Sequence, residues 1–280
     1  MYLTNFFSHL FGKIAEQTTP EILSRCILDT FVRIYKPNLD ECARPLGSFA
    51  SLAEFFVREL KPEARPIAKA PVAPVDGVLR TFGDIREGKL EQIKGRDYSL
   101  EGLVQSSALA NQFQHGYYLN FYLSPKDCHH VFSPVAGNVT EIKYIPGALF
   151  PVNNFAIRNI PGLFLKNERL VTRIAGGGGS EFGDVLVVMV GAFNVGKLYS
   201  AFGEVGLGQG GLSTDIAADS SSVAAGQRIG TFGLGSSVVL IFERALMQNA
   251  LALREGQCVR YGQPLLPGWG QVVVVPSKGS

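Results

Sequence analysis

Residues 232–240 read FGLGSSVVL, a turn of small residues that runs directly into an apolar stretch ending at Phe242. A turn followed by a short apolar run is typical of a buried β-strand. Comparable runs, separated by Gly, Pro, Asn and Asp, recur from Pro66 onward, and the expected strands are Gly77–Phe82, Gly116–Leu123, Asn138–Tyr144, Val185–Val190, Ser237–Phe242 and Gln271–Val275. The pattern predicts a β-rich domain over residues 66–280 with a sandwich-like or barrel-like arrangement.

Two short internal echoes fit this arrangement. PVDGVL at residues 74–79 and PVAGNV at residues 134–139 share a Pro-Val-x-Gly core ahead of an expected strand. AGQRI at residues 225–229 and EGQCV at residues 255–259 each place a small turn before a strand. Paired units of turn and strand suit a compact sandwich or barrel.

Residues 1–65 carry helical patterns instead, so the chain as a whole is of the α+β class. Three helices are expected from apolar spacing and capping signals. The first helix is indicated by an apolar stripe from Leu3 to Ile14. The second is indicated by Thr19 as N-cap, Pro20 at the first helical position, and a stripe of Leu23, Cys26, Ile27, Phe31 and Ile34. The third is indicated by a Ser51–Glu54 capping box before Phe55, Phe56 and Leu60.

These helices could pack on the β-domain, or they could lie in a membrane interface with their apolar faces among the acyl chains. Residues 1–65 hold eight basic and eight acidic side chains. Any contact with a membrane would therefore be hydrophobic rather than electrostatic.

Composition narrows the class of protein. The 280 residues are 46% hydrophobic and 18% charged, with a net charge of +2, which excludes a disordered chain and gives no basic footprint of a nucleic-acid binder. No apolar run approaches the ~18 residues of a membrane span, and the start of the chain lacks the features of a signal peptide. The four scattered cysteines indicate neither a disulfide framework nor a zinc ribbon, so a reducing compartment is expected.

Three segments concentrate groups that could carry chemistry, and each also has a plain structural interpretation. Asp76-Gly77 is a common hairpin-turn signal. His129 and His130 are adjacent on an expected strand and would face opposite sides, so no metal site is expected there. Ser236 could simply end a turn, or its hydroxyl could attack the carbonyl of Gly235.

A glycine triplet in a Gly/Ser-rich stretch is not expected to bind a nucleotide. Gly206, Gly208 and Gly211 have the right spacing, but no clear strand precedes them and a poor helix former follows. Residues 203–222 are therefore expected to be a loop.

Taken in order, several motifs resemble those of the phosphatidylserine decarboxylase family, and the resemblance covers most of the chain. They are Phe55–Pro62 with Ala64–Ile67, Pro74–Gly77, Lys94–Leu100, Phe121–His129, Tyr144–Gly147, Asn167–Arg169, Val190–Ala192 with Asn194–Gly196, and Leu234–Ser237.

The resemblance implies a proenzyme that cleaves itself between Gly235 and Ser236, giving a β chain of residues 1–235 and an α chain of residues 236–280. Ser236 would become a covalent pyruvoyl group, which forms a Schiff base with phosphatidylserine and supports its decarboxylation to phosphatidylethanolamine. Asp76 matches the family's processing aspartate, and His129 matches a histidine of the decarboxylation steps. Neither a metal nor a nucleotide is implied.

The resemblance also implies partners and a location. The substrate lies in a bilayer, so residues 1–65 are expected to form a membrane-associating region ahead of the decarboxylase domain, 66–280. The protein would be peripheral, on the cytoplasmic side of the cell membrane. The two chains would form a heterodimer, with further pairing of heterodimers left open, and no nucleic acid is expected to bind.

One departure from the family pattern bears on processing. Phe132 stands where the family has a second histidine that assists the serine, whereas Ser237 in place of threonine keeps a hydroxyl. His130 could substitute, because it shares a strand face with position 132 about 7 Å away. Alternatively, processing could be slow with another base, or the chain could stay uncleaved and act as a phospholipid-binding protein. A pyruvoyl decarboxylase of a soluble amino acid is a more distant alternative, which the Phe-rich N-terminal region disfavours.

Overall fold

The computed structural model describes residues 15–16, 18, 20–69, 71–176, 182–192, 198–203, 214–216, 221–233, 236–244 and 253–265. Nine antiparallel strands form the main sheet, in the order β10-β6-β7-β8-β13-β4-β1-β14, with β11 also paired to β6. Their bounds are β1 Gly77–Asp84, β4 Tyr117–Leu123, β6 Gly137–Ile145, β7 Arg169–Ala175, β8 Val185–Gly191, β10 Thr214–Ile216, β11 Ser221–Val223, β13 Ser236–Phe242 and β14 Cys258–Val259. With the helices of the first 65 residues, the sheet confirms the α+β class, and the described strands do not close into a barrel.

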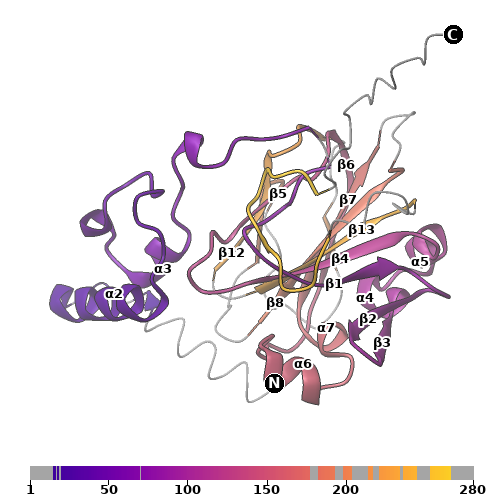
Figure 1. Cartoon of the computed structure of the whole chain (residues 1–280), viewed down its shortest axis with the longest axis horizontal. Coiled ribbons are helices and arrows are strands. Elements are labelled where there is room, and N and C mark those ends of the chain that lie inside the picture. Colours follow the sequence, from indigo (N-terminus) through magenta and orange to yellow (C-terminus); the bar gives the residue numbers. More distant parts are fainter. Residues whose placement is uncertain are drawn as a thin grey trace, which may run out of the picture.

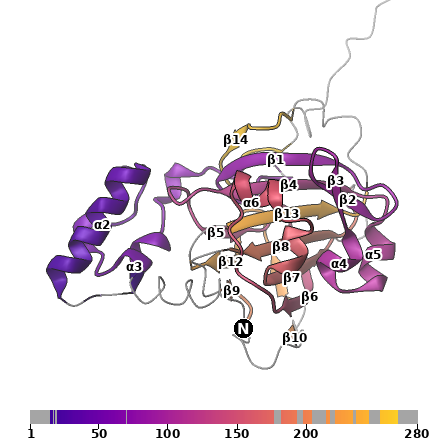
Figure 2. The same cartoon turned by 90° about the horizontal axis from the view of Figure 1, so that it is seen from below.

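Strand β13 lies at the centre of the sheet, between β8 and β4 (Figure 2). It pairs with each neighbour over seven consecutive residues, from Ser236 opposite Gly191 and Leu123 to Phe242 at the other end. All seven side chains of β13 and all seven of β8 are buried. Burial on both faces explains why these strands were recognisable as unbroken apolar runs.

Smaller elements surround this sheet, and most were not expected from the sequence. Helices α6 and α7 lie below the sheet in Figure 1 and in front of it in Figure 2. The additional elements are a three-stranded sheet of β5 (His130–Phe132), β12 (Arg228–Phe232) and β9 (Leu198–Ser200), a hairpin of β2 (Lys89–Ile93) and β3 (Arg96–Ser99), and the short helices α4 (Leu100–Val104), α5 (Ser107–Phe113), α6 (Asn154–Asn159) and α7 (Leu163–Lys166). The expected strand Gln271–Val275 lies outside the described residues.

The segments at the start of the two Pro-Val-x-Gly repeats pair with each other through backbone hydrogen bonds. The Val72 N–H donates to the Pro134 carbonyl at 2.9 Å, and the Phe132 N–H donates to the Pro74 carbonyl at 2.8 Å. The two segments therefore lie side by side ahead of β1 and β6. This pairing brings position 132 next to the segment that carries Asp76.

Two loop predictions need correction. Asp76 does not lie in a hairpin turn, because it precedes the first residue of β1 in a bend. Residues 203–222 are not loop throughout, because β10 and β11 fall within them and pair with β6. Gly206, Gly208 and Gly211 lie outside the described residues.

The N-terminal helical region sits to one side of the sheet in both views (Figures 1 and 2). Helix α2 spans Glu21–Tyr35 and its N-cap is Pro20, so the helix begins one residue later than the expected Thr19 cap. Helix α3 spans Leu52–Phe56, flanked by the short 3-10 turns Leu46–Ser48 and Pro62–Ala64. The stripe from Leu3 to Ile14 lies outside the described residues.

Helix α2 buries only one side of its expected apolar stripe. Its buried residues are Ser24, Leu28 and Phe31. Ile22 and Ile34 are 79% and 64% exposed, and Leu23 and Cys26 are also exposed. Helix α2 thus carries apolar residues on a face that the described part of the chain leaves open. Within that part, no helix has both the length and the hydropathy to cross a bilayer.

The capping box at the start of α3 is present as expected and fixes two aromatic side chains. Ser51 Oγ accepts a hydrogen bond from the Glu54 N–H at 3.2 Å, and Glu54 Oε2 reaches back to the Ala50 N–H at 2.7 Å. Phe55 and Phe56, which follow in the same helix, are fully buried.

Ser51→Ala removes this cap while leaving the apolar contacts of α3 in place. We expect it to lower the free energy of unfolding by about 1 kcal/mol, because an orphan N–H of the first turn loses its acceptor. Ser51→Thr retains a hydroxyl acceptor and should stay near wild type in the same urea titration. A loss as large for Thr as for Ala would show that the site responds to side-chain volume and not to capping.

Candidate active site

Ser236, the expected nucleophile, is the first residue of the central strand β13. Its side chain is fully buried, and its Oγ has no hydrogen-bond partner. Its cross-strand neighbours are Gly191 on β8 and Leu123 on β4. Gly235, the other half of the expected cleavage site, lies outside the described residues. The ladder therefore holds the Ser236 hydroxyl in a buried position where its Oγ has no hydrogen-bond partner.

Asp76, the expected processing aspartate, is held by an arginine and not by a histidine. Arg65 Nε and Nη2 donate to its two carboxylate oxygens at 3.0 and 2.6 Å, and the Tyr261 N–H donates to Oδ1 at 2.9 Å. Arg65 also donates to Glu41 at 2.8 Å. Burial acts to lower the pKa of Arg65, but the hydrogen bonds to Asp76 and Glu41 outweigh it and raise that pKa. Asp76 is thus tied into a buried ionic network.

His129 is fully buried and uncharged. Burial lowers its pKa to about 3, although a hydrogen bond to the Asp127 carbonyl acts in the opposite direction. Because a carbonyl can only accept, Nδ1 donates to Asp127 O at 2.9 Å, and Nε2 therefore carries the lone pair. That Nε2 has no partner. The ring packs on Phe56 of α3 with centroids 4.0 Å apart, so the helical region shapes this part of the site.

His130 and Phe132 share one face of β5, as strand periodicity predicted, with ring centroids 6.4 Å apart. His130 Nδ1 bonds to Thr231 Oγ1 at 2.9 Å, and Nε2 lies 3.6 Å from Glu59 Oε1. Burial lowers the pKa of His130. These two polar contacts lead to Thr231 and Glu59 and not to Asp76.

Phe132, where the resemblance leads us to expect a histidine, stacks on Tyr261 with centroids 3.8 Å apart and an interplanar angle of 17°. Tyr261 is the residue whose N–H binds Asp76. Tyr261 therefore links Phe132 to Asp76: its ring contacts Phe132 and its backbone N–H binds the carboxylate. The Phe132 ring itself has no atom that can accept or donate a proton.

Sequence reasoning assigned no role to two arginines that organise this site. Arg58 and Arg65 appeared only as parts of the motifs. Arg58 donates from the helical region to the Lys126 carbonyl at 2.6 Å and to the Asp127 carbonyl at 3.4 Å. Arg58 thereby holds the segment that precedes His129. No periodicity signals such contacts, because each joins residues that are far apart in the chain or outside regular structure.

Unpartnered buried polar atoms gather at this end of the sheet. Ten such atoms occur among the described residues, and seven of them belong to this region. The seven are Arg58 Nε, Ser124 Oγ, His129 Nε2, His130 Nε2, Glu168 Oε1, Ser236 Oγ and Ser237 Oγ. Because buried polar groups in folded proteins are nearly all satisfied, such a concentration is typical of a functional site and makes this end of the sheet the candidate.

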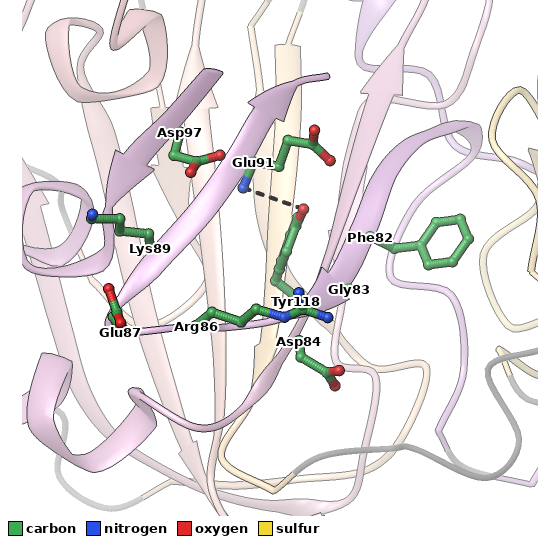
Figure 3. A pocket seen from close by; sticks show the side chains of 9 residues that line it. All are labelled: Phe82, Gly83, Asp84, Arg86, Glu87, Lys89, Glu91, Asp97 and Tyr118. Carbon is green, nitrogen blue, oxygen red and sulfur yellow. Dashed lines mark hydrogen bonds between the residues drawn. The ribbon is translucent and has the colours of Figure 1, made fainter. Parts of the chain in front are cut away.

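A pocket of about 450 Å³ lies elsewhere (Figure 3). It is lined by residues of β1 to β4, including Asp84 and Tyr118. Asp84 pairs with Tyr117, at the opposite end of β4 from Leu123 and Ser236. The pocket is therefore separate from the candidate active site. Among the described residues, no three His, Cys, Asp or Glu side chains are placed to hold a metal ion.

Comparison with known proteins agrees with the motifs. A family model described as phosphatidylserine decarboxylase matches residues 52–266. A phosphatidylserine decarboxylase proenzyme of Brevibacillus brevis is 36% identical over 267 residues, which cover 93% of each chain. A protein of the same name from Escherichia coli is 36% identical over 255 residues, covering 87% of this chain and 78% of its own. The chain therefore belongs to the phosphatidylserine decarboxylase family, a family of carboxy-lyases.

Proposed function

We propose that this protein decarboxylates phosphatidylserine to phosphatidylethanolamine, using a pyruvoyl group formed from Ser236 by self-cleavage after Gly235. The observation that carries the proposal is the buried Ser236 Oγ, which has no hydrogen-bond partner at the head of the central strand. Membership of the family supplies the reaction and the substrate.

The residues around Ser236 fit such a group. Position 236 is enclosed by protein, so a carbonyl there would be shielded from water. When formed, a pyruvoyl group supplies an electrophilic carbonyl and an acceptor for the electron pair left by departing CO₂. His129 presents a neutral Nε2 that can take a proton from a bound substrate and return it. Arg65 keeps Asp76 oriented beside the Phe132–Tyr261 stack.

The strand ladder would keep the two products of cleavage together. The α chain would begin with β13, which remains paired with β8 and β4 of the β chain over seven residues each. Two further backbone hydrogen bonds join the two pieces, from the Gly262 N–H to the Ala73 carbonyl at 3.0 Å and from the Ala73 N–H to the Gln263 carbonyl at 2.8 Å. The heterodimer expected from the family is therefore compatible with the uncut fold.

Phe132 and the Arg65–Asp76 pair favour one second candidate, an uncleaved phospholipid-binding protein. Such a protein would bind vesicles without releasing CO₂. Cleavage of the chain separates the two candidates directly.

Intact mass under denaturing conditions tests the proposal. The 30.3 kDa chain should split into two, with an α chain of about 5 kDa at the mean residue mass. The α chain should lack a free amine, and phosphatidylserine vesicles should yield phosphatidylethanolamine in a reaction that hydroxylamine blocks. Ser236→Ala should stay whole and inactive. A wild-type chain that remains at 30.3 kDa and still binds vesicles would favour the second candidate.

Phe132→His restores a titratable ring beside Tyr261 and Asp76. We expect the first-order rate of self-cleavage, followed by mass after cell-free synthesis, to rise about tenfold or more because a proton relay is regained. Phe132→Leu, the matched control without a titratable group, should not accelerate cleavage. An unchanged rate for Phe132→His would mean that this position no longer takes part in processing.

Peripheral attachment to the cytoplasmic side of the cell membrane is part of the proposal. The exposed Ile22, Leu23 and Ile34 of α2 support it, since they offer an apolar surface to the acyl chains. The four cysteines are free thiols, which suits a reducing compartment.

The double variant Ile22→Glu, Ile34→Glu should lose vesicle binding by about tenfold or more, because two apolar anchors become charged. Both side chains are exposed, so the melting temperature should change little. Phe155→Glu on α6, also an exposed apolar residue at 77%, serves as the control and should pellet with vesicles as wild type does. Normal pelleting of the double variant would exclude α2 as the anchor.

A further inference from the structure

A buried carboxyl group lies beside Ser236 on the same face of the sheet. Gly191 is the β8 partner of Ser236, and directly opposed residues of a ladder point to the same face. A Cβ atom on Gly191 would meet Glu168 Cγ at 2.8 Å and Oε1 at 3.0 Å. The Glu168 side chain therefore fills the space that a side chain at position 191 would take. On this face Ser236 has the Glu168 carboxyl on one side and Leu123 on the other.

The backbone around Glu168 is held firmly. The Glu168 N–H donates to the Ala148 carbonyl at 3.0 Å, and its carbonyl accepts from the Gly191 N–H at 2.9 Å. Asn167 Nδ2 donates to the Gly191 carbonyl at 2.8 Å. Arg169 is fully buried and donates to the carbonyls of Gly102, Leu103, Phe164, Leu165 and Asn167. The outer residues of the Asn-Glu-Arg motif thus position the glutamate between them.

The two oxygens of Glu168 differ in their contacts. Tyr144 Oη donates to Oε2 at 3.1 Å, whereas Oε1 is buried without a partner. Glu168 as a whole is 8% exposed. The Ser236 and Ser237 hydroxyls of β13 are likewise buried without a partner, and Ser236 is the one opposite Gly191. An acceptor over Gly191 and a donor opposite Gly191 are thus both without a partner.

We propose that Glu168 is the proton acceptor for Ser236 in self-cleavage, an inference that rests on the proposed function. Ser236 Oγ bonds to the carbonyl carbon of Gly235 while Glu168 takes the hydroxyl proton. The carbon–nitrogen bond between residues 235 and 236 breaks, and Glu168 returns the proton to the departing amine nitrogen. The products are an ester and a free amine, and Glu168 ends as it began. The chain is cut afterwards, when the Cα proton of residue 236 is lost and the Cβ–Oγ bond breaks, which releases Gly235 as a carboxylate. This step needs no histidine at position 132.

The acid–base state of Glu168 suits the step. Burial raises its pKa to about 7, although the hydrogen bond from Tyr144 acts to lower it. Among the described residues, Tyr144 from β6 is the titratable group that contacts it, while Gly191 from β8 and Ser236 from β13 carry no charge. A carboxylate with a raised pKa is a stronger base than an exposed one.

The test is the rate of self-cleavage, read as intact mass after cell-free synthesis, so it needs no mature enzyme. Glu168→Gln, which retains the volume and the Tyr144 contact, should slow cleavage by about 100-fold or more. Glu168→Asp should recover part of the rate. Wild-type cleavage should rise with pH through about 7 as Glu168 loses its proton, and Glu168→Gln should lose that rise.

Two further variants separate catalysis from folding. Gly191→Ala keeps the carboxyl but displaces it, so cleavage should slow. Asp184→Asn makes the same acid-to-amide change at the opposite end of β8, where Asp184 pairs with Arg173, and should cleave at the wild-type rate. Wild-type cleavage by a folded Glu168→Gln chain would overturn the inference and leave the proposed function intact. A wild-type chain that never cleaves would overturn both.

Discussion

The structure depends on the ladder that buries β13 between β8 and β4. Seven residue pairs on each side leave no side chain of β13 exposed, so the strand is among the last parts of the fold that could open locally. Ser236 is the first residue of that strand, so its position is fixed by one of the best-protected parts of the described fold. The same hydrogen bonds would retain the C-terminal piece after a cut at its start. The pairing of β13 thus both fixes the position of Ser236 and would hold the two pieces of a cut chain together.

A second constraint joins the helical region to the sheet. Arg65, the last residue of the helical region, bridges Glu41 of the same region to Asp76, which directly precedes β1. Arg58 and Phe56 reach the segment around His129 from the same side. Breaking a buried ion pair by removing one partner leaves an uncompensated charge and costs about 3–5 kcal/mol. The first 65 residues are therefore structurally coupled to the site, whatever part of them also meets a lipid surface.

The sequence predicts the parts of this fold that depend on local pattern. Val185–Val190 and Ser237–Phe242 were recognisable because burial on both faces demands unbroken apolar runs. Strand β7 escaped prediction because Arg169, Thr172 and Arg173 interrupt its apolar pattern, and Arg169 is buried only through its bonds to backbone carbonyls. The spacing of α2 predicts a helix, but which side meets the protein is decided by packing against α3 and is not encoded in the periodicity.

In the candidate site, too, local sequence pattern predicts some features, whereas others depend on tertiary contacts. The shared face of His130 and Phe132 follows from strand geometry, and Asp76, His129 and Ser236 were found through motifs. The Arg65–Asp76 pair and the placement of Glu168 over Gly191 arise from tertiary contacts that no spacing rule expresses. Each unsatisfied buried polar atom costs about 1–3 kcal/mol. Seven of them at one end of a well-packed sheet would be a heavy loss for stability alone. The loss becomes intelligible if these atoms find their partners only during the reaction, when the hydroxyl, the imidazole and the carboxyl exchange protons. Under the proposed function, the Ser236 hydroxyl, the His129 imidazole and the Glu168 carboxyl are the groups at this end of the sheet that would gain partners during the reaction.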